Sequence, residues 1–296
     1  MSTFVVTATA LNMRSEPKVT TTNRIALLPQ GHLVSKIRVA PQNPDWFEIS
    51  TILNGALFVG YVNGAFLAEQ DSVVFPIFDQ IGGVHLQPPK ALRSVRGIWA
   101  YPLSETNMPQ RDRNESVALQ KQTLLDIVDW LDVTQSDRYQ PGQNTYCNIY
   151  AYDYCSLAGA YLPRVWWNNN AIIKLLGGTE VSVKYGDSVY EVNANGLYNW
   201  LGDFGDHFGW QRLSNARELQ AQVNQGKVGI ISAENKSANN SGHIAVVIPE
   251  HDGFNATDNP FIPIQSQAGR VNRKKFNHLN WWTKPEFRAF GFWVHD

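Results

Sequence analysis

Hydrophobic and polar side chains alternate in short runs through the first seventy residues. Alternation with a period of two is typical of strands that bury one face. Turn-forming residues separate the runs, as at Pro29-Gln30-Gly31 and Asn54-Gly55. The pattern predicts about five short strands and therefore a small all-β barrel. The predicted strands cover residues 4–10, 25–31, 33–39, 46–49 and 58–62.

The pattern changes twice after residue 70. Residues 71–113 contain several prolines among apolar residues and are predicted to form a connector. Residues 114–296 first show the helical period and later short apolar runs. Helices followed by strands predict an α+β domain in which a helix packs on an antiparallel sheet. The predicted helices cover residues 115–132, 147–161, 168–176, 196–204 and 216–225, and the strands 228–231, 243–248, 261–265 and 290–294.

Composition narrows the possible partners. The chain has 296 residues, 43% of them hydrophobic, and a net charge of −1. This balance provides no basic field for nucleic acid, so no nucleic-acid partner is expected. No apolar run reaches the roughly 18–20 residues that a membrane span needs, so no membrane span is expected. Ten tryptophans are many for this length. Such chains often bind sugars or polymers, although a large aromatic core is the commoner explanation.

Cys147 is the candidate nucleophile. It follows the turn signal at residues 140–143 and opens an apolar helical pattern, so we expect it in the first turn of a helix. Unpaired backbone N–H groups and the helix dipole lower the pKa of a thiol at that position. The alternative is a buried structural cysteine. Cys155 is expected in the middle of the same helix, about 12 Å away along its axis, so the two cannot form a disulfide.

His243 is the candidate general base. It follows Gly242 and begins the apolar strand 244–248, where it would be partly desolvated. Gln265 and Gln267 are expected on one face of a neighbouring strand, where an amide oxygen could accept the imidazole N–H. Which of the two orients His243 stays open. The Cys147 N–H, with a donor such as Asn144 or Tyr146, is expected to stabilise an oxyanion.

The sequence lacks metal- and cofactor-binding signatures. We find no HExxH, no Cys/His zinc spacing and no phosphate-binding glycine loop. Neither a metal nor a cofactor is therefore expected.

The first seventy residues resemble a bacterial SH3 domain. The resemblance rests on Leu11–Pro17, Leu28–Gly31, Asp45–Ile49, Gly60–Val62 and Phe66-Leu67. It implies a non-catalytic module, residues 1–70, of a kind that commonly binds bacterial cell walls. The alternative is a packing domain that binds nothing. Trp46 and Tyr61 are the candidate wall-binding residues, and the alternative is that both belong to the core of the barrel.

Residues 114–296 resemble the papain-like cell-wall cysteine hydrolases of the NlpC and CHAP types. The resemblance rests on Thr145–Tyr150, Gly242–Val247 and Gln265–Gly269. It implies a papain-like helix-plus-antiparallel-sheet domain with Cys147 as nucleophile, His243 as base and Gln265 or Gln267 in third place. The CHAP type has Glu and Asn where this chain has glutamines.

The resemblance implies a peptidoglycan hydrolase, either an endopeptidase or an amidase. Two alternatives stay open: a cysteine protease or deamidase toxin that acts on proteins, and a non-catalytic wall-binding protein. We expect the protein to act on the cell wall, in the periplasm or outside the cell. No signal peptide is visible, which leaves release by phage lysis, release by a secretion system with an immunity protein as partner, or a removed leader.

Overall fold

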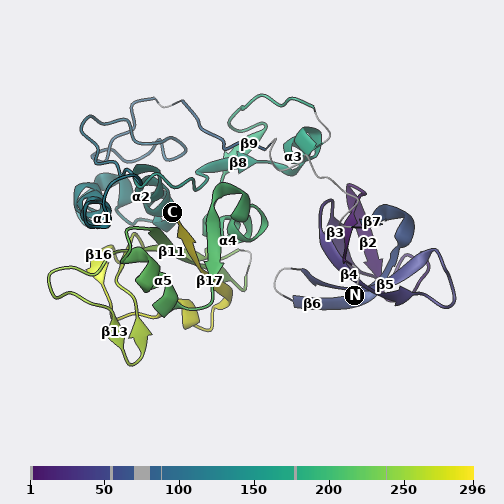
Figure 1. The fold of residues 1–296 in the computed structure, drawn as a ribbon. Coiled ribbons are helices and arrows are strands. Elements are labelled where there is room, and N and C mark those ends of the chain that lie inside the picture. Colours follow the sequence, from purple (N-terminus) through teal and green to yellow (C-terminus); the bar gives the residue numbers. More distant parts are fainter. Residues whose placement is uncertain (1–2, 54–55, 70–80, 88, 177–178, 238) are drawn as a thin grey trace. The chain divides into compact units, whose positions relative to one another are not determined.

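The computed structural model describes residues 3–53, 56–69, 81–87, 89–176, 179–237 and 239–296. The chain divides into two compact units, Met1–Gln80 and Ile81–Asp296 (Figure 1). The predicted turn at residues 54–55 and the predicted domain boundary at residues 70–71 lie outside the described residues. The predicted connector is divided, because residues 71–80 also lie outside the described residues whereas residues 81–113 belong to the second unit.

One antiparallel sheet forms the first unit, with strand order β3-β2-β6-β5-β4-β1-β7. Its core contains Val6, Met13, Leu28, Ile49 and Val62, all fully buried. These residues are the inward half of the alternating pattern in the sequence. The strands are β1 (Thr3–Val6), β2 (Ala10–Arg14), β3 (Arg24–Pro29), β4 (Leu33–Val39), β5 (Trp46–Leu53), β6 (Ala56–Asn63) and β7 (Leu67–Glu69).

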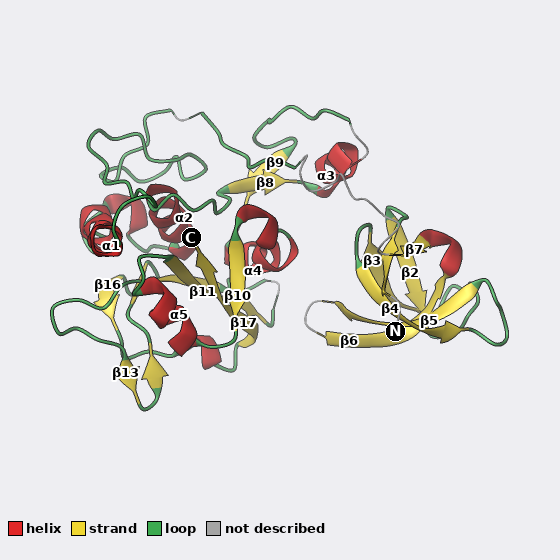
Figure 2. Ribbon diagram, in the orientation of Figure 1, coloured by secondary structure: helices red, strands yellow, loops and turns green. Residues whose placement is uncertain are grey.

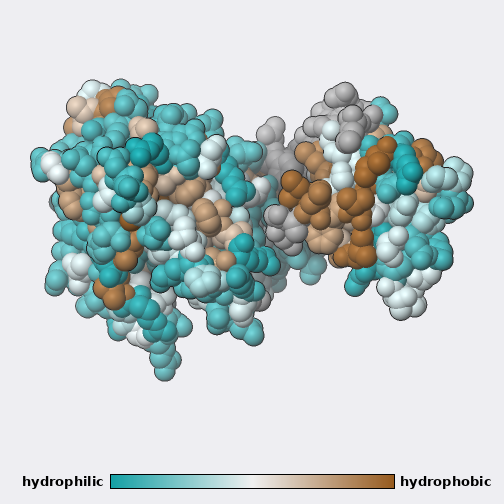
Figure 3. Space-filling model, turned by 90° about the horizontal axis from the view of Figure 1, so that it is seen from below, coloured by the Kyte–Doolittle hydropathy of each residue, from teal (hydrophilic) through white to brown (hydrophobic). Residues whose placement is uncertain are grey.

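The outer face of this sheet carries exposed hydrophobic residues. Ile52 and Leu57 pair across β5 and β6 and are 67% and 71% exposed. Leu27 on β3 is also exposed. Figure 3 shows hydrophobic side chains gathered on one side of this unit. Patches of this kind are found at interaction surfaces.

A six-stranded antiparallel sheet organises the second unit, with strand order β10-β17-β11-β12-β15-β16 (Figure 2). Two small sheets pair β8 with β9 and β13 with β14. The strands of the large sheet are β10 (Trp210–Leu213), β11 (Val228–Asn235), β12 (His243–Val247), β15 (Gln265–Gln267), β16 (Arg273–Phe276) and β17 (Phe287–His295). The others are β8 (Val165–Trp167), β9 (Val189–Glu191), β13 (Thr257–Asp258) and β14 (Phe261–Ile262).

Both faces of the large sheet are covered, since every residue of β11 is buried. Ile230 belongs to the core that contains α1, α2 and α4, whereas its neighbour Ile231 belongs to the core with α5 and the turn Trp281–Thr283. Successive side chains of a strand point to opposite faces, so β11 contributes to both cores. The helices are α1 (Val117–Leu131), α2 (Cys147–Leu157), α3 (Asn169–Leu176), α4 (Ala194–Asp203) and α5 (Ala216–Val223).

The prediction of an α+β chain with a papain-like helix-plus-antiparallel-sheet domain is wrong. The described residues contain 17 strands, which pair antiparallel, but only five α-helices, so the architecture is mainly β. The prediction failed because several strands are too short to show a period of two. The strands β8, β13 and β14 have two or three residues each, and β10 has four.

Side-chain caps explain where three helices begin. The Ser116 hydroxyl accepts the Leu119 N–H at the start of α1. Asn193 and Asn215 accept backbone N–H groups at the starts of α4 and α5. Each cap satisfies one of the amides that a helix leaves without a partner.

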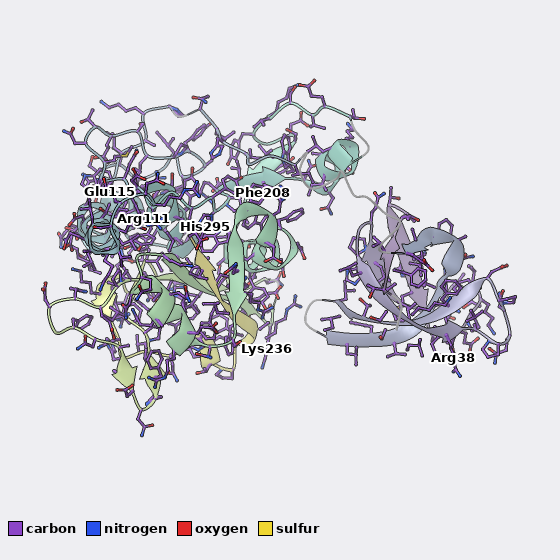
Figure 4. The ribbon with its side chains drawn as sticks, in the orientation of Figure 1. Arg38, Arg111, Glu115, Phe208, Lys236 and His295 are labelled. Atoms are coloured by element: carbon purple, nitrogen blue, oxygen red, sulfur yellow. The ribbon has the colours of Figure 1, made fainter. Side chains whose placement is uncertain are left out.

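The side chain of Arg111 ties three distant segments of the second unit together. It donates to the carbonyls of Gly226 at 2.7 Å, Ala158 at 3.1 Å and Asp296 at 3.3 Å. His295, labelled with Arg111 and Phe208 in Figure 4, hydrogen-bonds the Phe208 carbonyl at 2.9 Å. The C-terminal strand is thereby fixed to the core.

We predict that Asp153→Ala destabilises the second unit. The carboxylate lies on α2 and accepts hydrogen bonds from Arg138 Nε at 2.7 Å and from the Tyr139 hydroxyl at 2.9 Å, and Arg138 is fully buried. Leaving a buried cation unpaired costs about 3–5 kcal/mol. Urea unfolding followed by tryptophan fluorescence would measure this loss.

The matched control is Asp258→Ala, which removes the exposed ion pair with Arg217. An exposed pair contributes roughly 0–1 kcal/mol. Equal losses of unfolding free energy in the two variants would contradict a stabilising role for the buried pair.

Candidate active site

Cys147 is the first residue of α2, as its position after the turn predicted. In the preceding loop the Gly142 N–H donates to the Asn144 carbonyl at 3.0 Å. The Cys147 N–H is one of the first-turn amides that have no acceptor within the helix. Helix α2 contacts β12 and β15 of the large sheet, and the Tyr150 and Ser266 hydroxyls share a hydrogen bond of 2.5 Å between them. The nucleophile therefore lies on an element that is anchored to the sheet.

His243 is the first residue of β12, and its side chain lies close enough to Cys147 for each group to shift the pKa of the other. The chain enters the strand through Gly242, which is tightly enclosed. A Cβ atom there would lie 2.3 Å from the Ala233 carbonyl oxygen and 2.5 Å from Asn195 Oδ1. Only glycine fits this position without a shift of the backbone. The two residues proposed from the sequence as nucleophile and base are thus in contact.

Gln267 is the residue that holds the imidazole. The His243 Nε2 and Gln267 Oε1 atoms lie 2.8 Å apart. An amide oxygen only accepts, so Nε2 carries a proton and Nδ1 is the ring nitrogen left to exchange one. This arrangement fixes the tautomer that can take a proton from the Cys147 thiol.

Gln265 does not contact His243 and has a different role. Its Oε1 accepts a hydrogen bond from Trp281 Nε1 at 2.8 Å. The Trp281 ring packs edge-on against the His243 ring, with centroids 4.4 Å apart. The register explains the difference, since Gln265 pairs with Val247, four residues along β12 from His243. Four residues of strand span about 13 Å.

The sulfur and the imidazole stabilise each other's charged forms. Burial raises the pKa of the Cys147 thiol, but the charge of His243, the hydrogen bond to its ring and the N–H groups of Ile244 and Asn148 outweigh burial and lower this pKa. Burial lowers the pKa of His243, but Cys147 and the hydrogen bond to Gln267 outweigh it and raise this pKa. The geometry therefore favours a thiolate–imidazolium pair.

Cys155 lacks these interactions. It is fully buried in the middle of α2, and burial raises the pKa of its thiol. Both cysteines are free, and Cys155 is a core residue.

The surroundings of the other candidate residues are as follows. Asn144 is exposed in the loop before α2. The Tyr146 ring stacks on Trp99, with centroids 4.6 Å apart. Trp46 is buried in the first unit, at only 6% exposure, and Tyr61 is half-buried on β6 opposite Glu48. Trp46 therefore offers little surface to a ligand.

Sequence reasoning missed Trp281 and the N–H groups of Asn148 and Ile244. Hydrophobic patterning cannot reveal which backbone amides point at a sulfur, and Trp281 lies in a short 3-10 turn that carries no periodic signal. Over the residues that the structure describes, no group of three or more His, Cys, Asp or Glu side chains is placed to hold a metal ion. No described helix has the length and apolar character needed to cross a membrane.

We predict that Gln267→Ala raises the pH at which Cys147 becomes reactive. The hydrogen bond to Gln267 raises the pKa of His243, so its loss lowers that pKa, weakens the imidazolium and leaves the thiolate less stabilised. The pair titrates as a unit, so the midpoint of Cys147 alkylation moves to higher pH. Iodoacetamide labelling as a function of pH, with Cys155 as internal reference, would measure the shift.

Lys284→Gln is the control with the opposite sign, because the charge of Lys284 lowers the pKa of His243. Its midpoint should move slightly to lower pH. Midpoints that move in the same direction in both variants would contradict this description of the pair.

We predict that Gly242→Ala disrupts the site. The added methyl group collides with the Ala233 carbonyl and with Asn195, so the start of β12 and the His243 ring must shift. The alkylation rate of Cys147 at neutral pH and the melting temperature should both fall. Gly202→Ala on α4 is the matched control, since a Cβ there meets nothing within 4 Å. The prediction fails if both variants label at the wild-type rate.

Comparison with known proteins adds no family to this description. No protein-family model matches the chain, and no curated protein matches it. The function therefore has to be argued from the chemistry of Cys147, His243 and Gln267.

Proposed function

We propose that this chain is a cysteine hydrolase that cleaves amide bonds of bacterial peptidoglycan. The observation that carries the proposal is the placement of Cys147 at a helix start beside His243 at a strand start, with the His243 ring held by a hydrogen bond to Gln267. Nucleophilic acyl transfer requires a nucleophile, a base next to it and a group that orients the base. The choice of peptidoglycan rests on the resemblance of the surrounding sequence motifs to NlpC- and CHAP-type wall hydrolases.

In the first half of the proposed reaction, the Cys147 thiolate attacks the carbonyl carbon of an amide. The carbonyl oxygen becomes an oxyanion, which the Cys147 N–H at the start of α2 stabilises. The His243 imidazolium then gives its Nδ1 proton to the departing nitrogen. The C–N bond breaks, the amine leaves and a thioester remains on Cys147.

In the second half, His243 takes a proton from water, and the resulting hydroxide attacks the thioester carbonyl. The C–S bond breaks, the carboxylic acid leaves, and the thiolate and imidazolium are restored. Gln267 keeps Nε2 protonated throughout, so Nδ1 alone exchanges protons with the reacting atoms. The neutral amide adds no negative charge, so the thiolate itself is the main anionic partner of the imidazolium.

The first unit would hold the enzyme on its polymer. Binding to the wall would raise the local concentration of cleavable bonds without any change in the chemistry. This role rests on the resemblance to bacterial SH3 domains, and it implies action at the cell wall. An immunity protein would then be a partner only if a secretion system delivers the enzyme to other cells.

We predict that Cys147→Ala abolishes the release of soluble fragments from purified sacculi. Removing a covalent nucleophile should lower the rate by at least about 10³-fold. Cys155→Ala is the matched control and should retain activity, since that thiol is buried away from His243. Turbidity loss and mass spectrometry of released fragments would measure both.

Solubilisation by Cys147→Ala at the wild-type rate would rule out the mechanism. Activity of the wild type on unfolded protein but not on sacculi would instead identify a protein-directed hydrolase or deamidase. A Cys147 labelling rate no faster than that of a free thiol at neutral pH would indicate a non-catalytic wall-binding protein.

A further inference from the structure

Two arginines from distant segments of the second unit meet over the loop that leads to Cys147. Arg96 Nη2 donates to the Gln140 carbonyl at 3.0 Å and lies 3.0 Å from the position that a Cβ atom on Gly142 would occupy. Arg270 Nη1 donates to the Gly142 carbonyl at 3.2 Å. Both arginines are exposed. Two guanidinium groups therefore lie beside one residue of the loop that precedes the nucleophile.

The turn that carries Arg270 lies against the ring of the base. Arg270 directly follows Gly269, and a Cβ atom on Gly269 would lie 3.6 Å from His243 Cε1. The Asn272 side chain holds this turn, because its Oδ1 accepts the Gly269 N–H at 3.0 Å and its Nδ2 donates to the Tyr139 carbonyl at 3.0 Å. The backbone of Arg270 is therefore fixed relative to the imidazole and to the segment before the loop.

The segment that carries Arg96 packs beside the nucleophile. Trp99, which follows Arg96 closely in the sequence, stacks on Tyr146 with ring centroids 4.6 Å apart. Tyr146 directly precedes Cys147. The Trp99 indole N–H also donates to the Arg138 carbonyl at 3.2 Å. One arginine thus reaches the loop from beside the base and the other from beside the residue before the nucleophile.

The charge around this loop is positive and unbalanced. Residues 94–99, 140–147 and 267–272 contain the two arginines and no aspartate or glutamate. In the described part of the chain, each of the two guanidinium groups forms one hydrogen bond, to a loop carbonyl, and neither forms an ion pair. Like charges repel each other, and a bound anion would offset that repulsion. A guanidinium has five N–H donors, so donors remain for a ligand.

A carboxylate is the anion that fits these groups and the proposed chemistry together. Guanidinium and carboxylate groups are both planar and form paired, charge-assisted hydrogen bonds. Phosphate would also pair with arginine, but a peptide substrate carries carboxylates. The chain has a net charge of only −1, so the attraction belongs to this loop and is not a property of the whole protein.

We infer that Arg96 and Arg270 bind a free carboxylate of the substrate, close to the amide that Cys147 attacks. The inference rests on the proposed function and deepens it, because it makes these two arginines the residues that select acidic substrates over neutral ones. It is independent of which amide of the wall is cut.

The test uses muropeptides and the same muropeptides after conversion of their carboxyl groups to carboxamides. Wild type should cleave the native substrate with a kcat/KM about 10-fold above that for the amidated substrate, roughly the effect of two exposed charge-assisted contacts. The double variant Arg96→Gln/Arg270→Gln should lose this preference, mainly through a higher KM for the native substrate.

Arg113→Gln is the matched control, because it also removes an exposed arginine. Its segment meets the C-terminal end of α2, where the Arg111 N–H donates to the Leu157 carbonyl at 3.0 Å, whereas Cys147 begins the helix. This variant should keep the wild-type preference. A loop that is merely loosened by loss of the two arginines would slow both substrates equally. A double variant that keeps the preference, or a wild type without one, would overturn the inference.

A binding measurement separates this inference from the proposed function. In calorimetry, Cys147→Ala protein should bind native muropeptides more tightly than amidated ones, and adding Arg96→Gln and Arg270→Gln should abolish the difference. Equal binding of the two ligands, or no binding of either, would overturn the carboxylate site. A wild type that cleaves neither substrate would instead overturn the hydrolase, and the calorimetric comparison would still decide the carboxylate site.

Discussion

The packing of α2 across β12 and β15 is the constraint on which the reactive pair depends. Cys147 and His243 are the first residues of their elements, so a small displacement of the helix along the sheet would separate them. Two buried polar contacts of α2 oppose such a displacement. The Tyr150 hydroxyl joins Ser266 on β15, and Asp153 accepts Arg138 and Tyr139 from the preceding segment. Because these groups are buried, breaking either contact would leave polar atoms without hydrogen-bond partners and away from water, which costs free energy.

The two glutamines of β15 divide the support of the imidazole between them. Gln267 holds the ring nitrogen directly, and Gln265 holds the indole of Trp281 that packs against the ring. Both side chains come from one face of the same short strand, but the register brings only Gln267 within reach of His243. The result is an imidazole that is fixed by one hydrogen bond and one ring contact, with no carboxylate beside it. The charge balance of the pair is then governed mainly by the sulfur.

The two-stranded sheet of β8 and β9 lines a surface pocket of the second unit with aromatic side chains. Its tryptophans also pack into the aromatic core, as Trp166 lies edge-on to Trp200 with centroids 5.5 Å apart. The same side chains thus stabilise the fold and line the pocket. This double use explains why ten tryptophans in one chain were ambiguous as a signal. Composition alone cannot distinguish a core ring from a ring that also lines a cavity.

The sequence by itself determined the local elements and the chemistry that two of them carry. The period of apolar residues located α1, α2, α4 and α5 to within a few residues, and the turn before Cys147 indicated a helix start. The sequence also indicated that His243, directly after Gly242, begins a buried strand. These features depend on neighbours along the chain, so patterning can detect them.

Only the tertiary structure decided which distant residues meet. Strand register chose Gln267 over Gln265, the fold brought Trp281 to His243, and strands of two to four residues made the architecture mainly β. It also showed that Trp46 is buried. The physical reason is that contacts between elements depend on register and packing, which are set by the summed burial of many side chains. No short stretch of sequence carries that sum.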